Sequence, residues 1–185
     1  MNITQAVLNK LGYRNLSQVT TVIIHHSVAN KTTDIEDIDR MEKVSQGFIV
    51  VGYHEYLKCV DTEKDLWVAQ TGRPITAIPA AAYGMNTQSY DICIGGNYEP
   101  GGAPFLDEVS EKSLVVAAAQ IAHAKQKLPN LKYLIGHYRV AQIKAKQGLN
   151  PGDYSTACPG KGMVASLNKL RSLCGLEQYP GFVGD

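Results

Sequence analysis

The chain has 185 residues, a length that suits one domain with its own hydrophobic core. Hydrophobic residues make up 44% and charged residues 19% of it, a balance that excludes a disordered polyelectrolyte. The net charge of +1 is unevenly spread, because residues 111–171 carry ten basic and two acidic side chains whereas residues 1–110 carry an acidic excess. Such a basic segment indicates an anionic partner, nucleic acid or an acidic polymer, but it equally fits lysines on solvated helix faces.

Cysteine content and the N-terminal segment bear on the cellular compartment. The four cysteines are too few and too scattered for a disulfide scaffold, so we expect reduced thiols. Residues 1–15 lack the long apolar core of a signal peptide, and no apolar run approaches the length of a membrane span. We therefore expect synthesis in a reducing compartment, without a signal peptide and without a membrane-spanning segment.

Apolar periodicity predicts alternating strands and helices, and hence an α/β domain. Gly47 is expected to end one helix, and Ser110 to cap another. The expected elements are a short helix within 3–12, a strand over 21–26, a helix over 34–46, strands over 48–60 and 65–70, a loop over 72–89, a strand over 90–96, a turn over 97–104, a helix over 111–127, a strand over 131–137, a polar loop to residue 158, and a helix over about 161–174. We predict a single domain with a central mixed sheet flanked by helices on both sides.

Two adjacent histidines, His25 and His26, end the first strand, where neighbouring side chains point to opposite faces. His137 ends the last strand, and Cys158 lies beyond the polar loop. Two His and one Cys suit zinc, and three protein ligands leave a fourth position for water. Each residue also has an ordinary structural explanation, since a strand-end His is commonly hydrogen-bonded and a lone Cys commonly fills core space.

Five separated motifs occur in a consistent order: "VIIHHSVAN", "GFIVVGYHEYL", "GMNTQSYDICIGGNY", "LIGHYRV" and "STACPG". Together they resemble the type 2 N-acetylmuramoyl-L-alanine amidases, the zinc family that includes phage lysozyme-type amidases and animal peptidoglycan-recognition proteins. The resemblance covers about residues 20–172. It implies one zinc ion per chain, held by His25, His137 and Cys158, with His26 turned to the other face of the sheet.

The same resemblance implies two catalytic side chains. Tyr53 matches the tyrosine of the phage and animal branches, and Thr156 occupies a position that is Lys in the phage lysozyme type and Thr in the catalytic animal proteins. Both would steady the oxyanion that develops on the scissile carbonyl. Ala81 occupies a position where many relatives carry His, so one substrate contact is expected to be missing here.

Further substrate contacts are weaker expectations. Glu55 follows Tyr53 by two residues, so the two side chains are expected to share a face, with Glu55 either contacting substrate, acting as an accessory base or solvating itself at the cleft rim. Arg73 and Asn86 are expected to touch sugar or peptide, although turn-forming roles fit them as well. The basic segment between His137 and Cys158 is expected to form a wall of the cleft.

The resemblance thus implies hydrolysis of the amide between N-acetylmuramic acid and the L-alanine of peptidoglycan. It also implies a phage or prophage endolysin that is made in the host cytoplasm and acts on the wall after release. We expect residues 1–175 to form the catalytic domain and residues 176–185 a tail or the start of a linker. A monomer with no nucleic-acid partner is expected. Two alternatives stay open: a recognition module without catalysis, and a cytosolic amidase that recycles soluble muropeptides.

Overall fold

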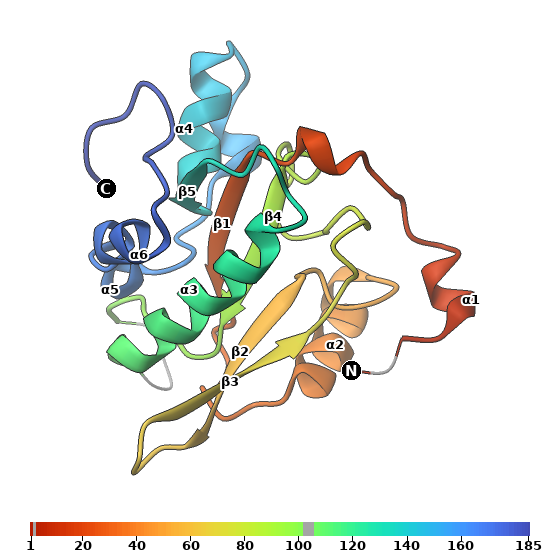
Figure 1. Ribbon diagram of the computed structural model, residues 1–185, viewed down its shortest axis with the longest axis vertical. Helices are drawn as coiled ribbons and strands as arrows, with labels where there is room; N and C mark the ends of the chain where they lie inside the picture. Colours follow the sequence, from red (N-terminus) through yellow and green to blue (C-terminus); the bar gives the residue numbers. More distant parts are fainter. Residues whose placement is uncertain (2, 102–105) are drawn as a thin grey trace.

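The computed structural model describes residues 1, 3–101 and 106–185, which fold around a mixed five-stranded sheet of order β3-β2-β4-β1-β5 (Figure 1). Strand β1 pairs in parallel with β4 and β5, β4 pairs in parallel with β2, and β3 runs antiparallel to β2. The strands are β1 (Thr21–His26), β2 (Glu55–Asp61), β3 (Leu66–Thr71), β4 (Ser89–Ile94) and β5 (Tyr133–Gly136). Residues 102–104 of the expected turn lie outside the described residues.

Local capping signals mark the end of α2 and the start of α3 where the sequence predicts them. Gly47 adopts a left-handed φ of 69° directly after α2, and the Ser110 side chain accepts the N–H groups of Lys112 and Ser113 at the start of α3. The helices are α1 (Gln5–Leu8), α2 (Ile35–Gln46), α3 (Glu111–Lys125), α4 (Arg139–Lys146), α5 (Lys161–Val164) and α6 (Leu167–Cys174), with 3₁₀ turns η1 (Leu16–Gln18) and η2 (Pro151–Tyr154).

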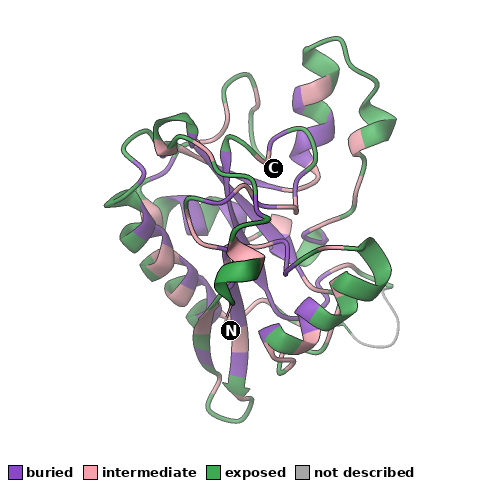
Figure 2. Cartoon of the chain, turned by 90° about the vertical axis from the view of Figure 1, so that its right-hand side faces the viewer, coloured by how far each residue is buried: buried purple, intermediate pink, exposed green. Residues whose placement is uncertain are grey.

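Helices cover both faces of the sheet, which buries its central strands. Every residue of β1 and β4 is buried, as the purple strands at the centre of Figure 2 show. Val22 and Ile24 of β1 pack toward α3 and α6, whereas Ile23 between them packs toward α4. Helix α2 packs on the same side as α4, over Tyr56 and Cys93. The alternation therefore directs His25 to the face of α2 and α4, and His26 to the face of α3 and α6.

Three expected elements differ in the structure. The strand expected over 48–60 begins only at Glu55, because the preceding segment bonds to the loop after β3, for example through the Ala80 N–H and the Gly52 carbonyl. The expected polar loop contains α4, whose Val140 and Ile143 bury their side chains against the sheet. The last helix is divided into α5 and α6 at residues 165 and 166.

The C-terminal residues 176–185 pack back onto the domain. Tyr179 and Phe182 contact the apolar cluster beneath α4, and the Asp185 carboxylate forms ion pairs with Arg139 and Arg171. Within the described residues, no helix combines the length and the apolar character that crossing a membrane requires.

Candidate metal centre and active site

Three side chains from distant parts of the chain meet at one edge of the sheet. His25 is at the carboxyl end of β1, and His137 directly follows β5, the parallel neighbour of β1. Cys158 reaches the same point from the segment after η2, where its Sγ accepts the backbone N–H of His26 at 3.4 Å. One ligand atom from each of His25, His137 and Cys158 lies within 4.8 Å of the others. The carboxyl edge of a parallel sheet is where α/β folds commonly place their sites.

The spacing of these groups fits a tetrahedral zinc site. The Nδ1 atom of His25 lies 3.7 Å from the Cys158 Sγ. Usual Zn–N and Zn–S bond lengths in a tetrahedron place nitrogen and sulfur about 3.6 Å apart. The rings of His25 and His137 are tilted by 59° with their centroids 4.7 Å apart, and a nitrogen of each lies within 4.8 Å of the other and of the Cys158 Sγ. Two imidazoles and a thiolate could therefore hold zinc, with one coordination position left for a reactant.

A buried carboxylate contacts the other nitrogen of His25. The Asp91 Oδ1 lies 2.8 Å from the His25 Nε2, and Asp91 has no exposed surface. Burial by itself would lower the pKa of His25, but its bonds to Asp91 and Cys158 outweigh burial and raise that pKa to about 9. Burial would likewise raise the pKa of Asp91, yet His25 lowers it on balance. In the metal-free protein, His25 and Asp91 therefore form a buried ion pair near pH 7.

The remaining histidines near the site are neutral. Burial, together with the charge of His25, lowers the pKa of His137 to about 3, so its ring is available as a neutral ligand near pH 7. His26 lies on the opposite face, as its place in the strand predicts, where its Nδ1 accepts the Tyr98 N–H at 3.3 Å. Burial lowers the pKa of His26 to about 4.

Tyr53 stands beside the cluster and lines a cavity of about 300 Å³ together with Glu42 of α2. Its ring centroid is 5.2 Å from that of His25. Burial, the Cys93 thiol and the Glu42 carboxylate all raise the pKa of Tyr53 well above 10, which keeps its hydroxyl protonated. The Glu42 Oε2 accepts the Gly52 N–H at 2.7 Å, and burial raises the pKa of Glu42. Tyr53 can thus act as a hydrogen-bond donor near the three ligands.

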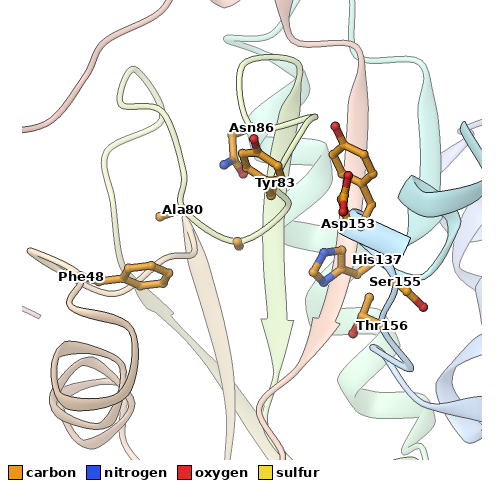
Figure 3. Close-up of a pocket in the computed structure, with 10 residues that line it drawn as sticks. Phe48, Ala80, Tyr83, Asn86, His137, Asp153, Ser155 and Thr156 are labelled. Atoms are coloured by element: carbon orange, nitrogen blue, oxygen red, sulfur yellow. The ribbon is translucent and has the colours of Figure 1, made fainter. Parts of the chain in front are cut away.

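A second cavity, of about 340 Å³, opens on the other side of the cluster and is lined by His137 and Thr156. Figure 3 shows Phe48 and Ala80 across this cavity from His137 and Thr156. Phe48, Ala80 and Ala81 line both cavities, so the two are halves of one groove that passes the ligands. Further lining residues of the second cavity, including Asn86, Asp153 and Tyr154, come from the loop after β3 and from η2.

Thr156 lines the groove next to one of the three clustered side chains, Cys158. Its Oγ1 accepts the Cys158 N–H at 3.1 Å, which fixes the hydroxyl two residues from that ligand. A hydroxyl that accepts one hydrogen bond still has its own proton to donate into the groove. The basic segment that was expected to form a wall of the cleft does so only at its end, where Asp153 and Tyr154 line the groove, and its lysines are not among the lining residues.

Glu55 does not share a face with Tyr53, contrary to the expectation from their spacing. Tyr53 precedes the strand, so the alternation of β2 does not extend to it. Glu55 instead pairs in register with Ile92 and lines a separate cavity of about 390 Å³ against α3, where the Tyr90 hydroxyl donates to it. Its position therefore gives no support to a substrate contact in the groove.

Arg73 and Asn86 make different contacts. The buried Arg73 guanidinium donates to the backbone carbonyls of Val50, Val51 and Ile78 at 2.8–3.0 Å, which ties the loop after β3 to the segment before Tyr53. Asn86 lines the groove, and its Oδ1 accepts the N–H of a loop residue, Ala82, at 2.8 Å. Arg73 thus shapes the groove without lining it, whereas Asn86 remains a candidate for substrate contact.

Sequence reasoning missed two acidic residues. Glu42 lies on the same stripe of α2 as the apolar residues Ile35, Ile38 and Met41. An acidic side chain at such a position is the one sequence signal that could have indicated a function for Glu42. Asp91 sits within a buried apolar strand, where a carboxylate requires a specific partner. Nothing local to the sequence indicates that this partner is His25.

The fold and the site define a single-domain α/β protein with a His–His–Cys cluster of metal-ligand spacing at the carboxyl edge of a mixed sheet. Residues 15–161 match the family described as N-acetylmuramoyl-L-alanine amidase, Amidase_2, and the chain belongs to this family. The resemblance drawn from the five motifs is thereby confirmed. No curated protein sequence matches the chain.

Solved structures of amidases and of recognition proteins share the fold. The amidase LysC from Clostridium intestinale has a TM-score of 0.67 at 21% identity, with 96% of each chain covered. Drosophila PGRP-LB has a TM-score of 0.67 at 20% identity, covering 94% of this chain and 91% of its own. The Ph2119 endolysin from a Thermus scotoductus bacteriophage has a TM-score of 0.63 at 16% identity, with 92% of each chain covered. The predicted fold class is confirmed.

Proposed function

We propose that this protein is a zinc-dependent N-acetylmuramoyl-L-alanine amidase that cleaves peptidoglycan in the manner of an endolysin. The reaction adds water across the amide between the lactyl group of N-acetylmuramic acid and L-alanine, and it yields a lactyl carboxylate and a free alanine amine. The observation that carries this proposal is the cluster of His25, His137 and Cys158, whose His137 lines the same groove as Tyr53 and Thr156. Membership of the amidase family supports it.

His25, His137 and Cys158 would hold the zinc ion, with the imidazoles neutral and the thiol deprotonated. When bound, zinc supplies Lewis-acid chemistry that polarises a carbonyl and lowers the pKa of a water molecule. The burial of His25, which is 1% exposed, excludes bulk water from one side of the cluster. The groove leaves the opposite side open to an extended substrate.

Tyr53 and Thr156 would act on the charge that develops at the scissile carbonyl oxygen. Both keep a hydroxyl proton at neutral pH, and both stand at the groove on either side of the ligands. Removing one such donor in other hydrolases costs about 10²–10³ in turnover. Tyr53 would also return a proton to the leaving alanine amine, with the nearby Glu42 holding its hydroxyl in place.

The test measures zinc per chain together with the chemistry of wall cleavage, for the wild type and for Cys158→Ser. Wild type should carry about one zinc and release new N-terminal alanine from purified sacculi without new reducing sugar ends. Cys158→Ser should lose both properties, since an alcohol is a poor zinc ligand. Full activity and full zinc content in Cys158→Ser would overturn the proposed site.

The same assay separates the two alternatives. A zinc-free wild type that binds sacculi but releases no alanine would be a recognition module. Faster turnover of soluble anhydro-muropeptides than of sacculi would indicate a recycling amidase instead. We place catalysis in residues 1–175, so a variant that ends at residue 175 tests whether the packed tail is needed for activity.

A further inference from the structure

We infer that Asp91 is a positioning residue that holds His25 in the tautomer and orientation needed to ligate a metal through Nδ1. This inference rests on the zinc site proposed above. It assigns a function to a buried carboxylate that lies outside the groove and that touches none of the reacting atoms.

The two nitrogens of His25 have separate partners in opposite directions. Nδ1 faces the Cys158 Sγ at 3.7 Å, and Nε2 faces the Asp91 Oδ1 at 2.8 Å. An ionised carboxylate only accepts hydrogen bonds, so it requires the proton on Nε2. The lone pair of the neutral ring must then be on Nδ1, which points toward the ligand cluster. Asp91 thereby selects the one tautomer that can bind a metal at this place.

Strand register places Asp91 where it can do this. In the parallel ladder of β1 and β4, Ile23 pairs with Asp91 and His25 pairs with Cys93. Asp91 is therefore two residues back from the cross-strand neighbour of His25, on the same face of the sheet. The imidazole lies back over β4 so that its far nitrogen meets the carboxylate. Both groups belong to central strands that are buried along their whole length.

Asp91 is itself fixed by three further hydrogen bonds. Its Oδ2 accepts the hydroxyl proton of Ser89. Its backbone N–H donates to the Nδ1 of His54 at 3.0 Å, and its carbonyl accepts the His54 N–H at 3.0 Å. Ser89 thus holds the carboxylate itself and the two bonds to His54 hold the main chain of Asp91, so the group keeps its place beside His25. The site is therefore preorganised for zinc.

Charge supports the same assignment. A divalent cation beside His25 would be balanced by the Cys158 thiolate and, one imidazole further out, by the Asp91 carboxylate. Carboxylates that bond to a ligating histidine raise the basicity of the ring, and their removal from zinc sites commonly weakens metal binding by about 10–100-fold. We expect a loss of this size here.

The experiment measures the zinc dissociation constant by chelator competition at one fixed pH for wild type, Asp91→Asn and Asp39→Asn. Asp39 is the matched control, since it is another buried carboxylate that accepts a backbone N–H, that of Val51 at 2.7 Å, away from the ligands. Asp91→Asn should weaken zinc binding about 10–100-fold. Asp39→Asn should lower thermal stability and leave the zinc affinity within twofold of wild type.

A second measurement needs no variant and so does not depend on one that folds. In the zinc-loaded wild type, two-bond ¹⁵N–¹H NMR spectra report which nitrogen of each ring is protonated, and His25 should show a protonated Nε2. Metal on the Nε2 of His25, or zinc affinity in Asp91→Asn within twofold of wild type, would overturn this inference alone. A wild type that binds no zinc would overturn the proposed function as well.

Discussion

Replacing Arg73 by Met tests whether this residue contacts substrate or supports the groove from behind. The guanidinium is 8% exposed and donates to three backbone carbonyls, those of Val50 and Val51 at 3.0 and 2.8 Å and that of Ile78 at 2.9 Å. Met keeps most of the apolar stem but leaves these carbonyls without their donor. Each unsatisfied buried carbonyl costs about 1–3 kcal/mol, and water reaches some of them, so we expect a total loss of about 3–5 kcal/mol.

The loss should appear in calorimetry as a fall in Tm. For a chain of this size, 1 kcal/mol corresponds to about 2–4 °C, so Arg73→Met should melt about 6–20 °C below wild type. Arg40→Met is the matched control, because the Arg40 side chain is 74% exposed on α2, and its Tm should move by no more than about 2 °C. The reasoning is refuted if Arg73→Met melts like Arg40→Met while its KM for sacculi rises. That result would mean that Arg73 contacts substrate.

Three further predictions concern the groove and His54, the buried histidine directly before β2. Glu42→Gln should lower the pKa of Tyr53, because it removes a nearby negative charge, although burial still keeps that pKa above 10. Ultraviolet titration measures this pKa, with Tyr53→Phe as the reference that lacks the Tyr53 signal. Burial lowers the pKa of His54 to about 4 in the folded protein, below the unfolded value of about 6.5. The neutral ring therefore supports folding fully above pH 6.5, and this stabilisation is lost as the pH falls toward 4. The stabilisation amounts to about 3 kcal/mol. Urea unfolding of the metal-free protein between pH 7.5 and 4.5 should therefore show a steeper fall in the free energy of unfolding for wild type than for His54→Gln. Thr156→Val should lower kcat on sacculi about 100-fold at unchanged zinc content, whereas Thr156→Ser should keep kcat within a few-fold of wild type. Equal rates for the two variants would show that the Thr156 hydroxyl takes no part in catalysis.

Local signals in the sequence were enough to predict the elements whose ends depend on one residue. Gly47 ends α2 and Ser110 caps α3 because a left-handed turn and a side-chain cap act within a single helical turn. The run of β-branched residues before His25 likewise predicted β1 correctly. These features need no knowledge of what the element packs against.

Elements that depend on distant partners were predicted less well. The segment before Glu55 has strand-forming residues, yet its backbone bonds to the loop after β3, and Tyr53 consequently faces a different side from Glu55. Helix α4 arises in a segment that is polar overall, because burying Val140 and Ile143 against the sheet stabilises it. In both cases, tertiary contacts outweighed the local pattern.

For the site, the motifs were enough to predict the residues with ligand chemistry, His25, His137 and Cys158. The parallel pairing of β1 and β5 then brings the two histidines together. The surroundings of these residues depend on tertiary contacts. Asp91 is 66 residues from His25 in the chain and 2.8 Å from it in space, through the register of β1 on β4. Register depends on packing across the whole sheet, so a buried partner of this kind cannot be read from residues on either strand alone.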